Sequence, residues 1–98
     1  MSRKFILAIQ VIPFTKDGNR NIIIDSAIDA IQKSGVKYLI GPCETVIEGT
    51  YEELIPVMEA TQQACFDAGA EELMVNLKIE RSRDNDMTLE RAMGKHLR

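Results

Sequence analysis

Residues 4–13 read KFILAIQVIP, and this stretch is the strongest indication of the fold. It is almost continuously apolar, is interrupted only by Gln10, and ends at Pro13, which has no backbone N–H to donate. Such a run is typical of a central strand that is covered on both faces. Side chains alternate along a strand. We therefore expect the exposed face of the sheet to carry Ile6, Ala8, Gln10 and Ile12 from this strand, or else the residues that alternate with them.

A helix is predicted over residues 21–34, after a loop with an Asp-Gly turn signal. Asn19 or Asn21 can cap its start, and Gly35 stands where a left-handed C-cap belongs. One apolar stripe at helical spacing predicts its buried face: Ile24, Ala27, Ile28 and Ile31.

A second helix is predicted to begin at Thr50, where Glu53 completes a possible capping box, and to end before Gly69. Pro56 conflicts with this start, because a proline inside a helix removes a backbone hydrogen bond. We therefore expect an irregular first turn, with the regular helix beginning nearer Pro56. The expected buried face consists of Leu54, Val57, Met58, Thr61, Ala64, Cys65 and Ala68.

Three further strands are predicted at residues 36–40, 45–49 and 71–81, the first two close enough in sequence to form a hairpin. In the last strand, polar residues alternate with a core-facing set formed by Leu73, Val75, Leu77 and Ile79. Residues 88–97 favour a short final helix with Leu89, Met93 and Leu97 at helical spacing.

This order predicts one domain over residues 1–98 with an α+β, ferredoxin-like βαββαβ fold. Its four-stranded antiparallel sheet carries two helices on one face, and a short C-terminal helix follows. An uncovered second face with apolar side chains beside Asn76 and Lys78 would be a sticky patch on a monomer. We therefore expect a homodimer or homotetramer that is assembled through sheet faces.

Composition and charge exclude several classes of protein. The formal net charge is -3, from 12 lysines and arginines against 15 aspartates and glutamates, so we expect no nucleic-acid partner. No apolar stretch is long enough to span a bilayer, so we expect no membrane partner. With only two cysteines, Cys43 and Cys65, we expect reduced thiols and a cytoplasmic location. Cys65, in a helical pattern, is expected in the core.

Residues that carry catalysis are scarce. His96 is the only histidine, no cysteine pair has metal-ligand spacing, and no glycine-rich phosphate loop is present. We therefore expect no catalytic residues, no metal and no cofactor, and a protein that is not an enzyme. A reactive Cys43 would favour an enzyme instead.

A few polar residues are candidates for binding. Glu44 and Glu48 point to the same face if both lie in a strand. Three interpretations of this pair are open: surface charge, recognition of a cationic ligand, or general acid and base catalysis. Gln10 needs a partner inside its apolar strand, from the backbone, another subunit or a ligand. Cys43 is an incidental loop thiol or lines a site.

Seven short motifs, in order along the chain, carry a family resemblance: Val11-Ile12-Pro13, Ser34-Gly35-Val36-Lys37-Tyr38, Pro42-Cys43-Glu44-Thr45, Ile47-Glu48-Gly49, Gly69-Ala70, Lys78-Ile79-Glu80 and Arg81-Ser82-Arg83-Asp84. By these motifs the chain resembles the small thiamine-binding, YkoF-like proteins over nearly its whole length. The resemblance implies a cytoplasmic ferredoxin-like domain, homodimers that form tetramers, and binding of thiamine or its hydroxymethylpyrimidine moiety without catalysis. The usual family loop is Pro-Met-Gly-Thr, whereas Glu44 here adds a carboxylate.

A thiamine-like ligand fits the chemistry of these residues. An aminopyrimidine offers donors and acceptors to amides and carboxylates, and Tyr38 stacks on a flat ring or belongs to ordinary hairpin packing. The alternative is an oligomeric regulatory or structural module that senses a different small metabolite. The predicted ligand site consists of Gln10, Tyr38, Cys43, Glu44, Thr45, Glu48 and Asn76.

Overall fold

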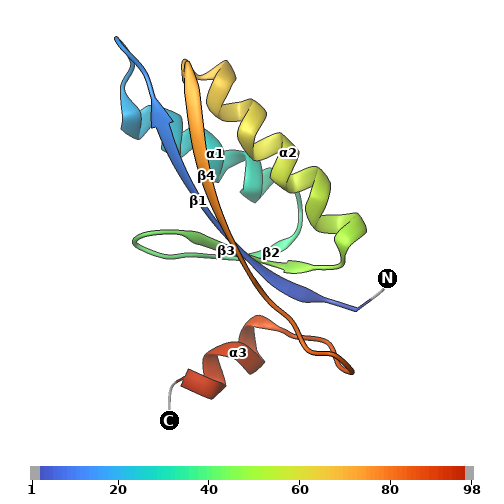
Figure 1. The fold of residues 1–98 in the computed structure, drawn as a ribbon. Helices are drawn as coiled ribbons and strands as arrows, with labels where there is room; N and C mark the ends of the chain where they lie inside the picture. Colours follow the sequence, from blue (N-terminus) through green and yellow to red (C-terminus); the bar gives the residue numbers. More distant parts are fainter. Residues whose placement is uncertain (1–2, 97–98) are drawn as a thin grey trace.

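The computed structural model describes the backbone of residues 3–96 and the side chains of residues 3–94. Its single sheet has the strand order β2-β3-β1-β4, with all neighbours antiparallel, which confirms the predicted ferredoxin-like fold. Figure 1 shows α1 and α2 on one face of this sheet and α3 apart from them at its lower end. The elements in order are β1 (Phe5–Phe14), α1 (Arg20–Lys33), β2 (Lys37–Ile40), β3 (Thr45–Gly49), α2 (Tyr51–Asp67), β4 (Glu72–Glu80) and α3 (Leu89–His96).

The first strand is central, as its apolar sequence predicts. Every residue from Phe5 to Ile9 is buried, because α1 and α2 cover one face of this half of β1 and α3 covers the other. Ile6, Ala8 and Gln10 share the second face with their directly opposite partners on β4. The main core lies between the sheet and the two long helices and contains Phe5, Leu7, Ile9, Ile31, Ile47, Leu54 and Val57.

Both long helices have the predicted caps. The Asn19 side chain accepts hydrogen bonds from the backbone N–H groups of Asn21 and Ile22, and α1 is followed by Gly35 with a φ of 86°. The predicted apolar stripe is shifted slightly, because Ile23 is fully buried while Ile24 and Ile28 are only partly buried. Their exposed edges face a cavity that is described below.

The prediction of an irregular start to α2 was wrong. The helix runs without interruption from Tyr51 to Asp67 with Pro56 inside it. The capping box explains this, since Thr50 Oγ1 accepts from Glu53 N at 3.3 Å and Glu53 Oε1 accepts from Thr50 N at 2.9 Å. These bonds hold the first turn in place before the chain reaches the exposed proline. Leu54, Val57, Thr61 and Cys65 form the buried face; the remaining predicted members are partly buried.

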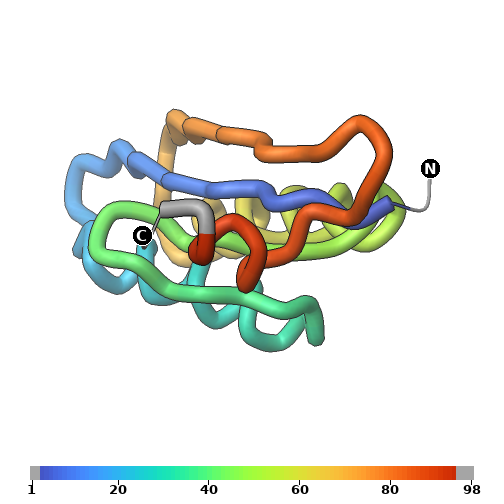
Figure 2. Tube along the Cα trace, turned by 90° about the horizontal axis from the view of Figure 1, so that it is seen from below, coloured from blue at the N-terminus to red at the C-terminus, as the bar shows by residue number. Residues whose placement is uncertain are grey.

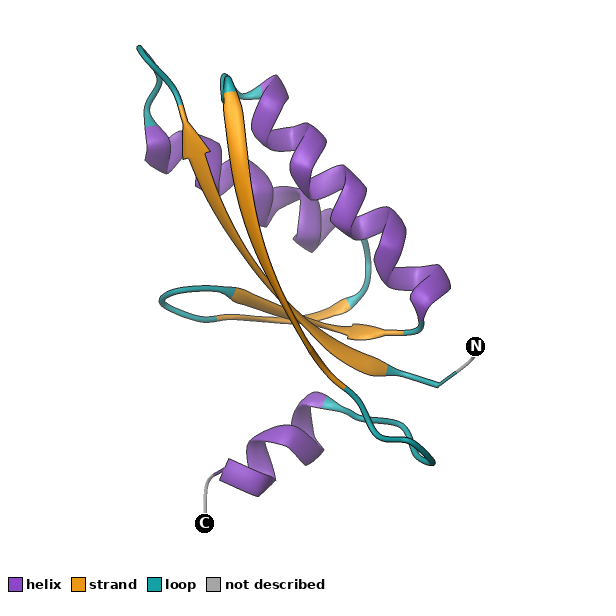
Figure 3. Cartoon of the chain, viewed as in Figure 1, coloured by secondary structure: helices purple, strands orange, loops and turns teal. Residues whose placement is uncertain are grey.

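The apolar set in β4 is not all core. Leu73 and Val75 are partly buried, but Leu77 and Ile79 are 42% and 52% exposed. The reason is position, because β4 is an edge strand and the helix layer does not extend over its second half. The cartoon shows the second half of β4 continuing beyond the two long helices (Figure 3).

The short final helix is confirmed and packs on the face opposite α1 and α2. Met87, Leu89 and Ala92 bury against Ile6, with Val46 beside them. Within the segment that the structure describes, Met93 is 44% exposed rather than buried; Leu97 and the His96 side chain lie outside it.

Hydrogen bonds and an ion pair attach the α3 segment to the sheet, among them a bond from Lys4 N to Asp86 Oδ1 at 2.9 Å. Glu48 Oε1 accepts from Leu89 N at 2.8 Å, and Met87 N donates to Lys4 O at 3.0 Å. Lys37 donates to Glu90, which raises the pKa of Lys37 and lowers the pKa of Glu90. The second face of the sheet is therefore covered at one end and open at the other.

Candidate functional site

Two cavities flank β1 and β3. The first, which we call the loop cavity, has a volume of about 410 Å³ and lies between β1, α1, α2 and the β2–β3 loop. The second, the α3 groove, has a volume of about 450 Å³ and lies between α3 and the face of the sheet opposite the long helices. Both volumes are within the range of small-molecule sites.

The loop cavity combines an apolar wall with a few polar groups. Apolar side chains come from two elements: Ile9 and Val11 on β1, and Ile24, Ala27, Ile28 and Ile31 on α1. Residues with polar side chains also line it: Gln10, Arg20, Cys43, Glu44, Thr45 and Thr61. Four of the seven predicted site residues, Gln10, Cys43, Glu44 and Thr45, are therefore brought together here.

The β2–β3 loop positions three of these four residues. Gly41 N donates to Glu44 O at 2.9 Å, which closes a tight turn with Pro42 and Cys43 at its tip. A Cβ atom on residue 41 would stand 3.0 Å from Glu44 O, so the close approach favours glycine. Because Thr45 then pairs with Ile9 in the sheet, its side chain is directed to the helix side and the cavity.

The Thr45 hydroxyl is available to a ligand. Thr45 is only 6% exposed, and no described group hydrogen-bonds to its side chain. Among the described residues, no fully buried side-chain oxygen or nitrogen lacks a partner, so this hydroxyl must open into the cavity. Thr61, by contrast, donates to Val57 O at 2.7 Å within α2.

Gln10 has its partner on the neighbouring strand. Its Oε1 accepts from Asn76 Nδ2 at 3.2 Å, and the two residues are directly opposite each other in the β1–β4 register. Asn76 itself does not line the loop cavity. This bond holds the Gln10 amide on the face of the sheet opposite the long helices, at the margin of the loop cavity.

The two glutamates have different roles. Glu44 lines both the loop cavity and the α3 groove, and it forms an ion pair with Lys78 at 3.1 Å. Glu48 is 8% exposed; it accepts from Leu89 N and lies 3.9 Å from Lys4 Nζ. Glu48 is thus an anchor for α3, and the two carboxylates do not converge on one ligand.

Tyr38 lies outside both cavities. It is 39% exposed on β2, opposite Ile47, and lines neither the loop cavity nor the α3 groove.

Arg20 and Thr61 are polar residues of the loop cavity that the sequence analysis did not predict. Thr61 could have been identified from the sequence, because it is a polar residue within a predicted buried helix face. Nothing in the sequence places Arg20 beside the hairpin loop.

The two cysteines have different environments, which predicts different reactivity. Cys43 is exposed in the loop, while Cys65 is fully buried, and burial raises the pKa of the Cys65 thiol. At neutral pH we expect iodoacetamide to label Cys43 and to leave Cys65 unlabelled until the protein is denatured, as measured by peptide mass spectrometry. Cys43→Ser is the control and should remove all fast labelling. Labelling of Cys65 at the rate of Cys43 would contradict this environment.

Within residues 3–94, no group of three or more histidine, cysteine, aspartate or glutamate side chains could hold a metal ion. No helix of the described chain is long and apolar enough to cross a membrane.

Comparison with known proteins decides the family. Residues 7–96 match the family described as thiamine-binding protein. The chain belongs to this family. The resemblance that the sequence motifs indicated is thereby confirmed.

Relatives of this thiamine-binding family member are similar over most of their length. The UPF0045 protein YqgV of Bacillus subtilis is 32% identical over 78 residues, which cover 76% of this chain and 75% of YqgV. A UPF0045 protein of Clostridium perfringens is 28% identical over 90 residues, 92% of this chain and 94% of that protein.

Solved structures share the fold. A Bacillus cereus domain of unknown function, DUF77, superimposes with a TM-score of 0.90 at 35% identity, covering 97% of this chain and 91% of that domain. A candidate thiamine biosynthesis/salvage protein of Thermotoga maritima superimposes with a TM-score of 0.82 at 29% identity, covering 95% and 98%.

Proposed function

We propose that this protein is a non-catalytic binding protein that holds thiamine, or its hydroxymethylpyrimidine moiety, in the loop cavity. The observation that carries this proposal is an apolar cavity that Gln10, Glu44 and Thr45 all line, with the Thr45 side chain directed into it. The family to which the chain belongs and the description of the Thermotoga maritima neighbour support a ligand of this class.

The cavity suits a flat, polar-edged ring. An aminopyrimidine has ring nitrogens that accept hydrogen bonds and an amino group that donates them, and the Thr45 hydroxyl can both donate and accept. The isoleucines of α1 supply an apolar surface for the face of the ring. Glu44 at the edge provides a carboxylate for the thiazolium cation of thiamine, in competition with Lys78.

We also propose that the protein acts in the cytoplasm as a homo-oligomer assembled through sheet faces. Both cysteines are free thiols, which suits a reducing compartment. At the open end of the second sheet face, Phe14 and Met74 are 48% and 52% exposed. Packing of a second sheet over this end would remove these side chains from water.

Titration calorimetry with thiamine and with hydroxymethylpyrimidine tests the binding proposal. We expect both to bind, and we expect Thr45→Val to weaken binding by about fivefold to tenfold, because one buried hydrogen bond contributes about 1 kcal/mol. Tyr38→Phe is the matched control: it also removes one hydroxyl, but from a side chain outside the cavity, and should leave the dissociation constant unchanged.

The proposal fails if neither compound releases heat nor raises the melting temperature of the wild-type protein. It also fails if Tyr38→Phe weakens binding as much as Thr45→Val does, because the ligand would then lie elsewhere. Circular dichroism of each variant shows that the fold is retained.

A further inference from the structure

The start of α1 lies at the loop cavity. Figure 2 shows this helix start and the β2–β3 loop at the same end of the molecule, as Figure 1 does from another side. Arg20 is exposed, whereas Ile24 and Ile28 are partly buried. The apolar wall that α1 gives to the cavity therefore ends in a cation. The lining residues of α1 recur at helical spacing on one face: Arg20, Ile24, Ala27, Ile28 and Ile31.

No described residue neutralises this cation. Within residues 3–94, Arg20 makes no hydrogen bond and no ion pair through its side chain, and the first turn of α1 contains no acidic residue. Glu44 also lines the cavity, but its carboxylate pairs with Lys78 at 3.1 Å, and Lys78 lies on the α3 side of the sheet. The charge of Arg20 is therefore available to a ligand.

The position of Arg20 in its helix favours an anion beside it. A helix N-terminus has a partial positive charge, so a cation in the first turn is unfavourable unless an anion is bound there. Asn19 Oδ1 accepts from the backbone N–H groups of Asn21 and Ile22, but the N–H of Arg20 has no acceptor among the described residues. A guanidinium and a free N–H at one helix end are donors that suit a phosphate group.

The cavity indicates a ligand independently of the helix start. Thr45 is 6% exposed, and its hydroxyl has no described partner and opens into the cavity. Hydroxyl groups that are buried to this extent are normally paired. A ligand that satisfies both features has a ring beside Thr45 and the isoleucines, and an anionic group at Arg20.

We propose that the loop cavity takes its aminopyrimidine ligand as a phosphate monoester, with the phosphate bound by Arg20 and the first turn of α1. This inference rests on the proposed function and names the form of the ligand. The planar guanidinium can donate two parallel hydrogen bonds to a phosphate. Hydroxymethylpyrimidine phosphate and thiamine monophosphate both have this chemistry. Arg20 then determines specificity for the phosphorylated form, while Thr45 contacts the ring of either form.

Titration calorimetry with two matched pairs of ligands tests this specificity. Each pair is an alcohol and its phosphate ester: hydroxymethylpyrimidine with its phosphate, and thiamine with thiamine monophosphate. In one pair we expect the wild type to bind the ester at least about tenfold more tightly than the alcohol, and that pair identifies the ligand. Arg20→Gln should reduce this advantage to less than about threefold and leave binding of the alcohol unchanged, which also shows that the variant is folded.

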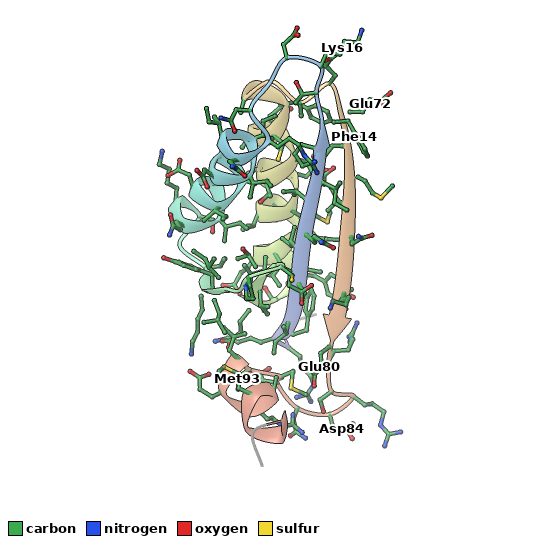
Figure 4. All side chains as sticks on the ribbon, turned by 90° about the vertical axis from the view of Figure 1, so that its left-hand side faces the viewer. Phe14, Lys16, Glu72, Glu80, Asp84 and Met93 are labelled. Carbon is green, nitrogen blue, oxygen red and sulfur yellow. The ribbon has the colours of Figure 1, made fainter. Side chains whose placement is uncertain are left out.

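Arg83→Gln is the matched control. It also removes one guanidinium, but Arg83 pairs with Asp84 and lines neither the loop cavity nor the α3 groove. Figure 4 shows Asp84 at the opposite end of the molecule from Lys16, which lies in the loop before α1. This variant should keep the full advantage of the ester. Thr45→Val should weaken binding of alcohol and ester by the same factor.

A phosphate ester without an aromatic ring shows whether the cavity is used as well as Arg20. Ribose 5-phosphate should bind at least about tenfold more weakly than the preferred ester, because it has no flat ring for the apolar wall.

Three results would overturn the inference and leave the proposed function in place. The first is equal affinity for alcohol and ester in both pairs. The second is an equal loss of ester binding in Arg20→Gln and Arg83→Gln. The third is binding of ribose 5-phosphate as tight as that of the preferred ester. If none of the four pyrimidine compounds binds the wild type, the proposed function itself is wrong, and this inference with it.

Discussion

Ile47→Ala is expected to lower the free energy of unfolding by about 2 to 5 kcal/mol. Ile47 is fully buried at the centre of the main core, between β1 and β2 in the sheet and beneath the helix layer. Alanine removes its outer carbons, and the surrounding side chains cannot close the space completely. For a chain of 98 residues this loss is a large share of a total stability of about 5 to 15 kcal/mol.

Urea denaturation followed by circular dichroism measures this loss. Ile22→Ala is the matched control, because it makes the same chemical change on α1 at a side chain that is 58% exposed. We expect the control to stay within about 0.5 kcal/mol of the wild type. Equal effects of the two substitutions would contradict the core described above.

Glu48→Ala is expected to release α3 while the rest of the fold stays intact. Glu48 follows Ile47 in β3 and points to the opposite face, where its Oε1 accepts from Leu89 N at 2.8 Å. Without it, that buried N–H loses its partner, at a cost of about 1 to 3 kcal/mol. α3 then detaches, and Ile6 and Leu89 become exposed to water.

Hydrogen exchange with mass spectrometry detects this local opening. We expect the amides of residues 87–94 to exchange at least about tenfold faster, with unchanged rates in β1 and α2. Glu48→Gln is the control, since its side-chain oxygen can still accept from Leu89 N, and it should preserve most of the protection. Unchanged exchange in Glu48→Ala would show that the apolar contacts alone hold α3.

Much of the fold follows from local sequence signals. The apolar run at residues 4–13 predicted the central strand, and the capping residues Asn19 and Thr50 predicted both helix starts. Pro56 led to a wrong prediction, because the strength of the capping box that precedes it depends on geometry that spacing alone does not give. Leu77 and Ile79 were assigned to the core because alternation identifies a face but not whether a helix covers it.

The candidate site was less predictable than the fold. Gln10, Cys43, Glu44 and Thr45 meet at the loop cavity, but Glu48 is used to anchor α3. Sequence spacing placed Glu44 and Glu48 on one side of a strand. It did not show that residues 87–92, far along the chain, return to cover one of them and not the other.

The amino-acid sequence by itself determined the elements, their order, the family and the face to which each strand residue points, because these depend on period, caps and motifs that act over a few residues. Only the tertiary structure decided which faces are covered. In the folded chain the Thr45 hydroxyl faces a cavity, Glu48 is buried beneath α3, and the outer edge of β4 is uncovered. These outcomes depend on packing between segments that are distant in the chain, and no local pattern encodes their contact.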